Sequence, residues 1–180
     1  MNNLHWGARD KSGAQVTIPL LQGDEVLATF VTDHKAETTT AQVGDRTWTF
    51  EAGRKGDAVA RVGDSIEYRA VPSKGRFDRS DNVTVTVGKR TFKLTREAKS
   101  DWIVEVEPHN DKVAQFTGAQ HGVRHVELEV EEGAELSQDE AVFLAWVARI
   151  VLEARLVGFT WILTVCLLAL TPFIVWVFLL

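Results

Sequence analysis

The chain has 180 residues, of which 45% are hydrophobic and 25% are charged, and its formal net charge is −5. So high an apolar content at so small a net charge excludes a disordered chain. All 20 Lys and Arg and all 25 Asp and Glu lie at or before Arg155, so residues 156–180 carry no charge. This asymmetry excludes a plain soluble enzyme and predicts one domain with an appendage.

The first 13 residues contain neither the apolar core nor the small-residue cleavage site of a signal peptide. We therefore expect an N-terminal arm at residues 1–13 and a main domain that stays in the cytoplasm. The basic residues agree with this orientation, because Arg149 and Arg155 precede the uncharged tail and no Lys or Arg follows it.

Residues 15–132 show period-two alternation in short runs. Val83, Val85 and Val87 share one face of such a run, while Thr84 and Thr86 share the other, which is typical of a half-buried antiparallel strand. Turn signals such as Gly-Asp separate the runs, and evenly spaced short strands favour a barrel or a sandwich. The pattern predicts about eleven strands, near residues 15–21, 25–32, 36–43, 46–51, 57–62, 65–71, 83–87, 90–96, 102–107, 112–117 and 126–130.

A helix is predicted to begin at Ser137. Ser137 and Glu140 form a capping box, in which the serine hydroxyl accepts from the Glu140 amide and the Glu140 carboxylate reaches back. The body that follows is apolar around its whole circumference over residues 141–148, yet an apolar run of about 18 Å is too short to span a membrane. A helix that is apolar on every side must be surrounded, and a closed sheet of about twelve strands would surround it.

Residues 156–180 are predicted to form a transmembrane anchor. As a helix they would measure about 37 Å, against a hydrocarbon core of about 30 Å. Arg155 would then reach back to the headgroups. Aromatic side chains, which favour the two membrane interfaces, lie near both ends of the segment: Phe159, Trp161, Trp176 and Phe178.

Many short antiparallel strands, Gly-Asp and Asn-Asp turns before Val-Ala strands, and the apolar helix sequence DEAVFLAWVARIVLEAR resemble the tubby-like barrel shared by LURP-one-related proteins and phospholipid scramblases. The resemblance implies a mainly β fold, a closed antiparallel barrel of about twelve strands around a C-terminal hydrophobic helix. It would cover residues 14–155, with the central helix at 137–155. The uncharged segment at 156–180 departs from that pattern. The resemblance implies binding or membrane association, so it supplies no catalytic residue.

Catalytic and metal-binding patterns are absent from the sequence. It contains no G-x-S-x-G, P-loop, G-x-G-x-x-G or H-E-x-x-H motif. His121 and His125 would lie about 13 Å apart on a strand, too far to share a metal ion. The single cysteine, Cys166, lies inside the uncharged tail and can form no disulfide within the chain. We therefore predict no catalytic residue, no metal, no cofactor and no enzyme activity.

The charge distribution along the chain is uneven. Residues 101–140 are strongly acidic, whereas residues 74–100 are basic and form a candidate surface for anionic lipid or a protein partner. The alternative is a solvated surface, or one matched by carboxylates of the same chain. The acidic total disfavours nucleic acid as a partner. The basic candidates, called here the basic set, are Lys74, Arg76, Arg79, Lys89, Arg90, Lys93, Arg96 and Lys99.

These features predict a non-enzymatic, single-pass protein of the plasma membrane, with its barrel on the cytoplasmic side of a tail anchor. It would act as an accessory, scaffold or assembly subunit of a larger integral-membrane complex, whether respiratory, secretory or for transport. One alternative is a module that binds anionic phospholipids or moves them as a scramblase does. Another is a hydrolase or transferase whose site has no recognisable motif.

Overall fold

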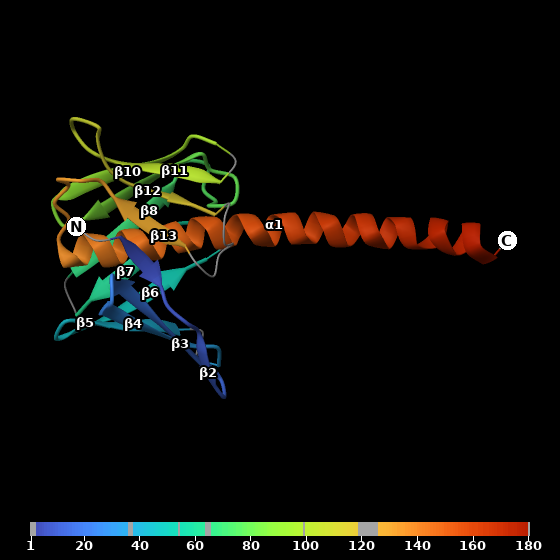
Figure 1. The fold of residues 1–180 in the computed structure, drawn as a ribbon, viewed down its shortest axis with the longest axis horizontal. Coiled ribbons are helices and arrows are strands. Elements are labelled where there is room, and N and C mark those ends of the chain that lie inside the picture. The colour runs from blue at the N-terminus through green and yellow to red at the C-terminus, as the bar shows by residue number, and fades with distance from the viewer. Residues whose placement is uncertain are drawn as a thin grey trace.

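The computed structural model describes residues 3–35, 38–53, 55–63, 66–98, 100–118 and 126–179, and for 66, 157–163, 165–166 and 172–179 it describes only the backbone. This described part contains thirteen antiparallel strands and one long helix (Figure 1). The elements are β1 (Leu4–Trp6), β2 (Asp10–Ser12), β3 (Gln15–Gln22), β4 (Glu25–Asp33), β5 (Thr38–Val43), β6 (Arg46–Ala52), β7 (Ala58–Val62), β8 (Ile66–Pro72), β9 (Asn82–Val87), β10 (Arg90–Arg96), β11 (Asp101–Val106), β12 (Asp111–Thr117), β13 (Glu127–Val130) and α1 (Gln138–Leu179).

Twelve of the described strands close into a barrel, which confirms the predicted architecture. Consecutive strands from β3 to β13 pair as antiparallel neighbours. β1 completes the ring because it pairs with β13, where Leu4 faces Leu128, and also with β3, where Trp6 faces Leu20. β2 is an extra strand that pairs with β3.

All eleven strands expected from the alternation are present, with ends that shift by one or two residues. The structure adds β1 and β2 within residues 1–13, so the predicted N-terminal arm is part of the sheet. Leu4 and Trp6 are 1% and 3% exposed and lie on the inner face. A strand of three residues is too short for alternation to reveal, which explains why the barrel begins earlier than the sequence indicated.

The hairpin turns alternate between the two ends of the barrel. The end where α1 begins, called here the cap end, carries the turns that contain Gly23 and Gly44. Their φ angles are 61° and 59°, and a glycine with positive φ at the first central position matches the type II′ turn that suits a two-residue hairpin. The opposite end, where α1 leaves the barrel, is called the exit end.

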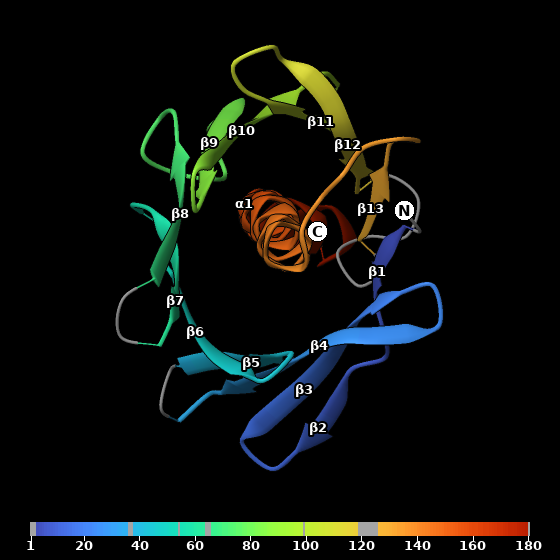
Figure 2. The same ribbon diagram turned by 90° about the vertical axis from the view of Figure 1, so that its left-hand side faces the viewer.

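The first part of α1 lies inside the ring of strands (Figure 2). All of residues 141–148 are at most 7% exposed, and the Phe143 ring lies 5.8 Å from Tyr68 and 5.6 Å from Trp146. The predicted sheath around an all-apolar helix is therefore confirmed. Burial of apolar surface on every side of the helix is the main stabilising contribution at this position.

The predicted capping box is present at the start of α1. The Glu140 amide donates to Ser137 Oγ at 3.3 Å, and the Ser137 amide donates to Glu140 Oε2 at 2.8 Å. Side chains of the barrel wall also hold this helix end: Arg90 forms an ion pair of 2.8 Å with Glu140, and Tyr68 Oη donates to Asp139 at 2.6 Å. The first turn of α1 is thus held in place by side chains of two separate strands, β8 and β10.

α1 continues without interruption for 42 residues and projects from the exit end (Figure 1). The helix therefore continues through residues 155 and 156, where the predicted core part and the uncharged tail meet. In the part of the chain with described side chains, no helix is long and apolar enough to cross a membrane. Most side chains of the predicted anchor, at 157–163, 165–166 and 172–180, lie outside that part.

Candidate functional site

The candidate site is the exit end of the barrel, where a polar cluster and a cavity lie on different sides of α1. Arg155 follows Trp146 by about two and a half helical turns, so the two side chains point in opposite directions. On the Arg155 side, a Cβ placed at Gly118 would lie 3.1 Å from Leu152, which shows how closely the helix approaches the end of β12. On the Trp146 side the structure contains a cavity.

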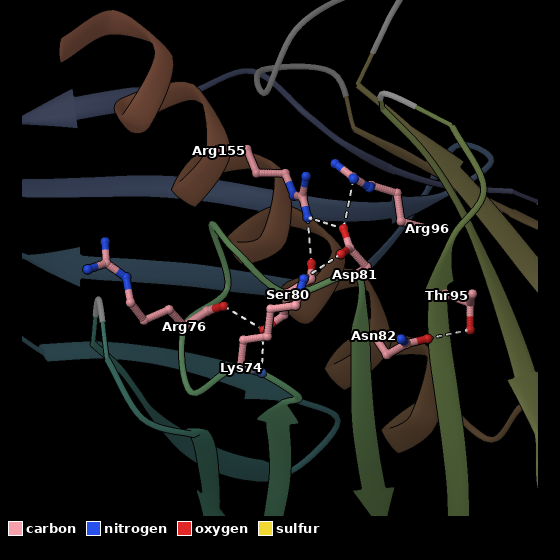
Figure 3. A network of polar contacts seen from close by, with 8 residues as sticks. All are labelled: Lys74, Arg76, Ser80, Asp81, Asn82, Thr95, Arg96 and Arg155. Atoms are coloured by element: carbon pink, nitrogen blue, oxygen red, sulfur yellow. Dashed lines mark hydrogen bonds and ion pairs between the residues drawn. The ribbon is translucent and has the colours of Figure 1, made fainter. Parts of the chain in front are cut away.

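A polar cluster ties α1 to the wall on the Arg155 side (Figure 3). The Arg155 guanidinium donates to the backbone carbonyl of Ser80 and lies 3.6 Å from Asp81 Oδ1. Asp81 also forms ion pairs of 2.7 Å with Lys74 and with Arg96. We call Arg155, Ser80, Asp81, Lys74 and Arg96 the arginine clamp. It joins the helix to the β8–β9 loop and to the end of β10.

Burial and charge both shape the arginine clamp. The Arg155 guanidinium lies 5.1 Å from the centre of the Trp102 ring, and its partial burial lowers the pKa of Arg155. Hydrogen bonding by Lys74, with the nearby charges of Arg96 and Arg155, lowers the pKa of Asp81. Ser80 is fully buried; its hydroxyl accepts from the Lys74 amide at 2.9 Å and donates to the Arg76 carbonyl at 2.7 Å. The loop that receives Arg155 is therefore itself ordered by buried hydrogen bonds.

The cavity on the opposite side of α1 measures about 700 Å³ and is open at the exit end. It lies between α1 and the inner faces of β1, β3, β4, β5 and β6, and at the edge of the barrel it also touches Glu51 and Val59, which alternate with the inward residues of β6 and β7. Its floor is a row of four aromatic rings, Trp6, Phe30, Phe50 and Trp146, whose successive centres are 4.8, 4.9 and 4.7 Å apart. All four are at most 7% exposed, so the aromatic floor forms part of the hydrophobic core.

The rim of the cavity is charged. Arg149 donates to Glu153 at 2.7 Å and lies over the Trp6 ring at 4.8 Å. Two further rim carboxylates are matched by arginines of the barrel: Glu51 pairs with Arg61, and Asp57 pairs with Arg69 at 2.9 Å. The cavity therefore has charged side chains around its mouth and buried aromatic side chains beneath it.

The basic set does not form one patch. Lys74, Arg76, Arg79 and Arg96 lie at the exit end, Lys89 and Arg90 lie at the cap end, and Lys93 lies between them on β10. Because β10 runs the full height of the barrel, residues close in sequence are placed at opposite ends.

Several residues of the basic set form ion pairs with carboxylates of the same chain. Arg76 pairs with Asp78 at 2.8 Å, and Arg90 pairs with Glu140; Lys74 and Arg96 belong to the arginine clamp. Arg79, Lys89 and Lys93 form no ion pair with a described side chain. Lys99 lies outside the described residues. Four members of the basic set therefore pair with carboxylates of the same chain, as the alternative interpretation expected. These carboxylates lie in the β8–β9 loop and at the start of α1, and none lies in the acidic strands β11 to β13.

The structure describes the side chain of only one of the predicted membrane-interface residues. Arg155 belongs to the arginine clamp, whereas the side chains of Phe159, Trp161, Trp176 and Phe178 lie outside the described part. His121 and His125 lie outside it as well. Among the residues that the structure describes, no group of three or more His, Cys, Asp and Glu side chains could hold a metal ion.

Sequence reasoning missed the cavity and the arginine clamp. The position of Arg155 as the last charge before the tail was a signal that this residue matters. Its partners could not be inferred, because Ser80 and Asp81 are distant in sequence and resemble any polar turn. No protein-family model, no curated protein and no solved structure matches the chain.

Proposed function

We propose that the protein is a non-enzymatic, single-pass membrane protein that serves as an accessory, scaffold or assembly subunit of a larger integral-membrane complex. The observation that carries this proposal is the apolar surface of α1 beyond the barrel. Leu167, Leu168 and Leu170 are 58%, 67% and 52% exposed on a helix that projects away from the core. Exposed apolar surface on this scale calls for cover by lipid or by another protein.

Two features of the projecting segment favour lipid as the environment of its apolar surface. Residues 156–180 contain no charged side chain, so insertion would bury no ionised group. The hydroxyl of Thr171 donates to the Leu167 carbonyl at 2.8 Å, which satisfies this polar group inside the helix, as a bilayer interior requires. A tail of this length as a helix is sufficient to span the hydrocarbon core, which is about 30 Å thick.

The distribution of basic residues supports a cytoplasmic barrel. Of the described turn residues, Lys35, Lys55, Lys74, Arg76 and Arg79 lie at the exit end, next to the tail, whereas Lys89 lies at the cap end. Lys and Arg beside a membrane span are enriched on the cytoplasmic side. The same side of the plasma membrane carries anionic lipids that attract basic residues.

The rigid connection between barrel and tail supports a subunit role over a lipid-transfer role. The arginine clamp and the continuous helix fix the direction in which the barrel faces, so the outer surface of the barrel would meet membrane neighbours in a defined orientation. A surface site for anionic phospholipid is less well supported, because the basic set is divided between the two ends and partly paired. The wrapped helix agrees with the layout of the tubby-like barrel, and membership of that superfamily remains part of this proposal.

Co-purification tests the proposal. The full-length chain, expressed in its native cells and extracted in mild detergent, should retain an integral-membrane partner in fixed proportion, as measured by mass spectrometry. A variant that lacks residues 156–180 is the control and should lose the partner. Release of the full-length chain from membranes by alkaline washing would contradict the anchor, and purification of the anchored chain with lipid but without protein would contradict the subunit role.

A further inference from the structure

The projecting part of α1 contains a proline inside a continuous helix. α1 runs from Gln138 to Leu179, and Pro172 lies within it (Figure 1). In an α-helix the amide of each residue donates to the carbonyl four residues earlier, and proline has no amide hydrogen. The Leu168 carbonyl therefore lacks its helical donor.

The neighbouring hydroxyl does not replace this donor. Thr171 Oγ1 donates at 2.8 Å to the carbonyl of Leu167, which is also the acceptor of the Thr171 amide in a regular helix. Residues 156–180 contain no Lys or Arg whose side chain could turn back to Leu168. A donor for this carbonyl must therefore come from outside the segment.

The position of Leu168 restricts where that donor can come from. Leu168 stands at the centre of the uncharged segment, with residues 156–167 before it and residues 169–180 after it. At about 1.5 Å per residue it lies about 18 Å from either end of the segment. In the membrane anchor proposed above, this depth is far from headgroups and interfacial water, and hydrocarbon chains offer no donor. Backbone groups freed by a proline at such a depth are paired by a neighbouring helix.

The surface beside this carbonyl is open to a neighbour. Leu168 is 67% exposed and Leu167 is 58% exposed, so the chain itself does not cover this side of the helix. We call the side of α1 that carries Leu168 the acceptor face. Leu170 lies on the opposite side, because two residues correspond to a rotation of about 200° around an α-helix.

From these observations we infer that the acceptor face binds a transmembrane helix of the integral-membrane partner, and that this helix carries a hydroxyl or amide side chain that donates to the Leu168 carbonyl. Ser, Thr, Asn and Gln form such hydrogen bonds between membrane helices. A second copy of this chain is less suitable, because the Thr171 hydroxyl near this depth already donates to its own helix. The inference rests on the proposed membrane anchor and names the surface and the partner chemistry of the proposed subunit role.

Site-specific photo-crosslinking tests the acceptor face. A photoreactive amino acid replaces Leu168 or, as the matched control, Leu170 in the full-length chain, which is expressed in its native cells and irradiated in intact membranes. We expect a covalent adduct with an integral-membrane protein from position 168 and much less of it from position 170. Equal adducts from the two positions, or an adduct from position 168 only with a second copy of this chain, would overturn the inference.

Alkaline extraction of the same membranes separates failure of the inference from failure of the proposed function. A chain that is released by the extraction contradicts the anchor itself. A chain that stays in the membrane and retains its partner, but forms no adduct from position 168, contradicts only the acceptor face.

Two variants test the hydrogen bond. Pro172→Ala supplies the missing amide and favours helix, so partner retention in mild detergent should fall about threefold, as expected for the loss of one hydrogen bond between membrane helices. Thr171→Val is the control: it removes the hydroxyl bond to Leu167 but leaves the Leu168 carbonyl without a helical donor, so retention should be unchanged. Unchanged retention in Pro172→Ala, or equal losses in the two variants, would mean that the partner does not donate to Leu168.

Discussion

Arg155 is the residue at which the barrel and the projecting helix are joined. The sequence predicts that Arg155 reaches headgroups; in the structure its side chain is 18% exposed, and its guanidinium donates to the β8–β9 loop. Ser80 and Asp81 offer oxygen acceptors to Arg155 at the exit end of the barrel. A charge count along the chain cannot reveal such partners.

Removal of this guanidinium tests the arginine clamp. Arg155→Gln should lower the free energy of unfolding by about 1 to 3 kcal/mol, because the variant loses hydrogen bonds from a charged group and leaves the Ser80 carbonyl without its donor. The control is Arg61→Gln, which removes exposed ion pairs on the barrel surface and should cost less than about 1 kcal/mol. Denaturant unfolding measures both. Equal losses in the two variants would mean that the clamp contributes no more than an ordinary surface pair.

Tyr68 reports on the packing at the start of α1. Burial, and next its hydrogen bond to Asp139, raise the pKa of Tyr68 to about 12 from an ordinary value of 10.0. A raised pKa means that the folded state holds its proton longer than the unfolded state. The contribution to stability is therefore complete below about pH 10 and is lost as the pH rises toward about 12.

Ultraviolet titration of the phenolate checks this value directly, because the chain contains a single tyrosine. Asp139→Asn should move the titration midpoint toward 10 without reaching it, because burial, the largest cause, is retained. Asp57→Asn, a surface change at the opposite end of the barrel, should leave the midpoint unchanged. An unshifted midpoint in Asp139→Asn would exclude the carboxylate as a cause.

At the scale of the element, α1 has two environments along one continuous helix. Leu144 is 1% exposed inside the barrel, whereas Leu168 is 67% exposed beyond it. The same truncation at both positions therefore measures the environment alone. Leu144→Ala should cost about 2 to 5 kcal/mol in unfolding free energy, and Leu168→Ala should change it by less than about 0.5 kcal/mol. Similar effects at the two positions would contradict the division of α1 into a core part and a projecting part.

The sequence was most informative about elements with a strong period or a specific cap. Alternation located eleven strands, and the capping box located the start of α1, because both signals arise from local geometry. It could not reveal β1, in which only Leu4 and Trp6 face inward, nor the pairing of β1 with both β3 and β13. Ring closure depends on contacts between distant segments, and no local pattern encodes them.

At the scale of the whole molecule, α1 does not occupy all of the space inside the barrel. The contact between Gly118 and Leu152 and the arginine clamp act on the same side, and the cavity is the space left on the other. Sequence reasoning predicted that a barrel would surround the helix, but the lateral position of a helix in a barrel depends on the sizes of side chains from many strands. The candidate site was for this reason beyond prediction from the sequence.

Deletion of residues 156–180 tests whether the barrel is complete without the tail. The fragment retains Arg155 and the whole core part of α1, so we expect native near-UV circular dichroism and a cooperative unfolding transition. The full-length chain in nanodiscs is the reference. Loss of the near-UV signal in the fragment would show that the tail contributes to the core.

The continuity of α1 predicts that the orientation of the barrel matters for the proposed subunit role. A five-residue Gly/Ser insertion after Arg155 keeps the arginine clamp and the uncharged tail but interrupts the helix between them, because glycine costs about 1 kcal/mol per residue in a helix. Folding and membrane association should be unchanged, while co-purification with the integral-membrane partner should fall. A five-residue Ala/Glu/Lys insertion at the same point, which favours helix, is the control: it should leave the barrel rigidly joined to the tail, and spin-label distances between barrel and tail should be narrow in this control and broad in the Gly/Ser variant. If partner association were equally strong in the wild type and in the Gly/Ser variant despite the broadened distances, a fixed orientation would play no part in assembly.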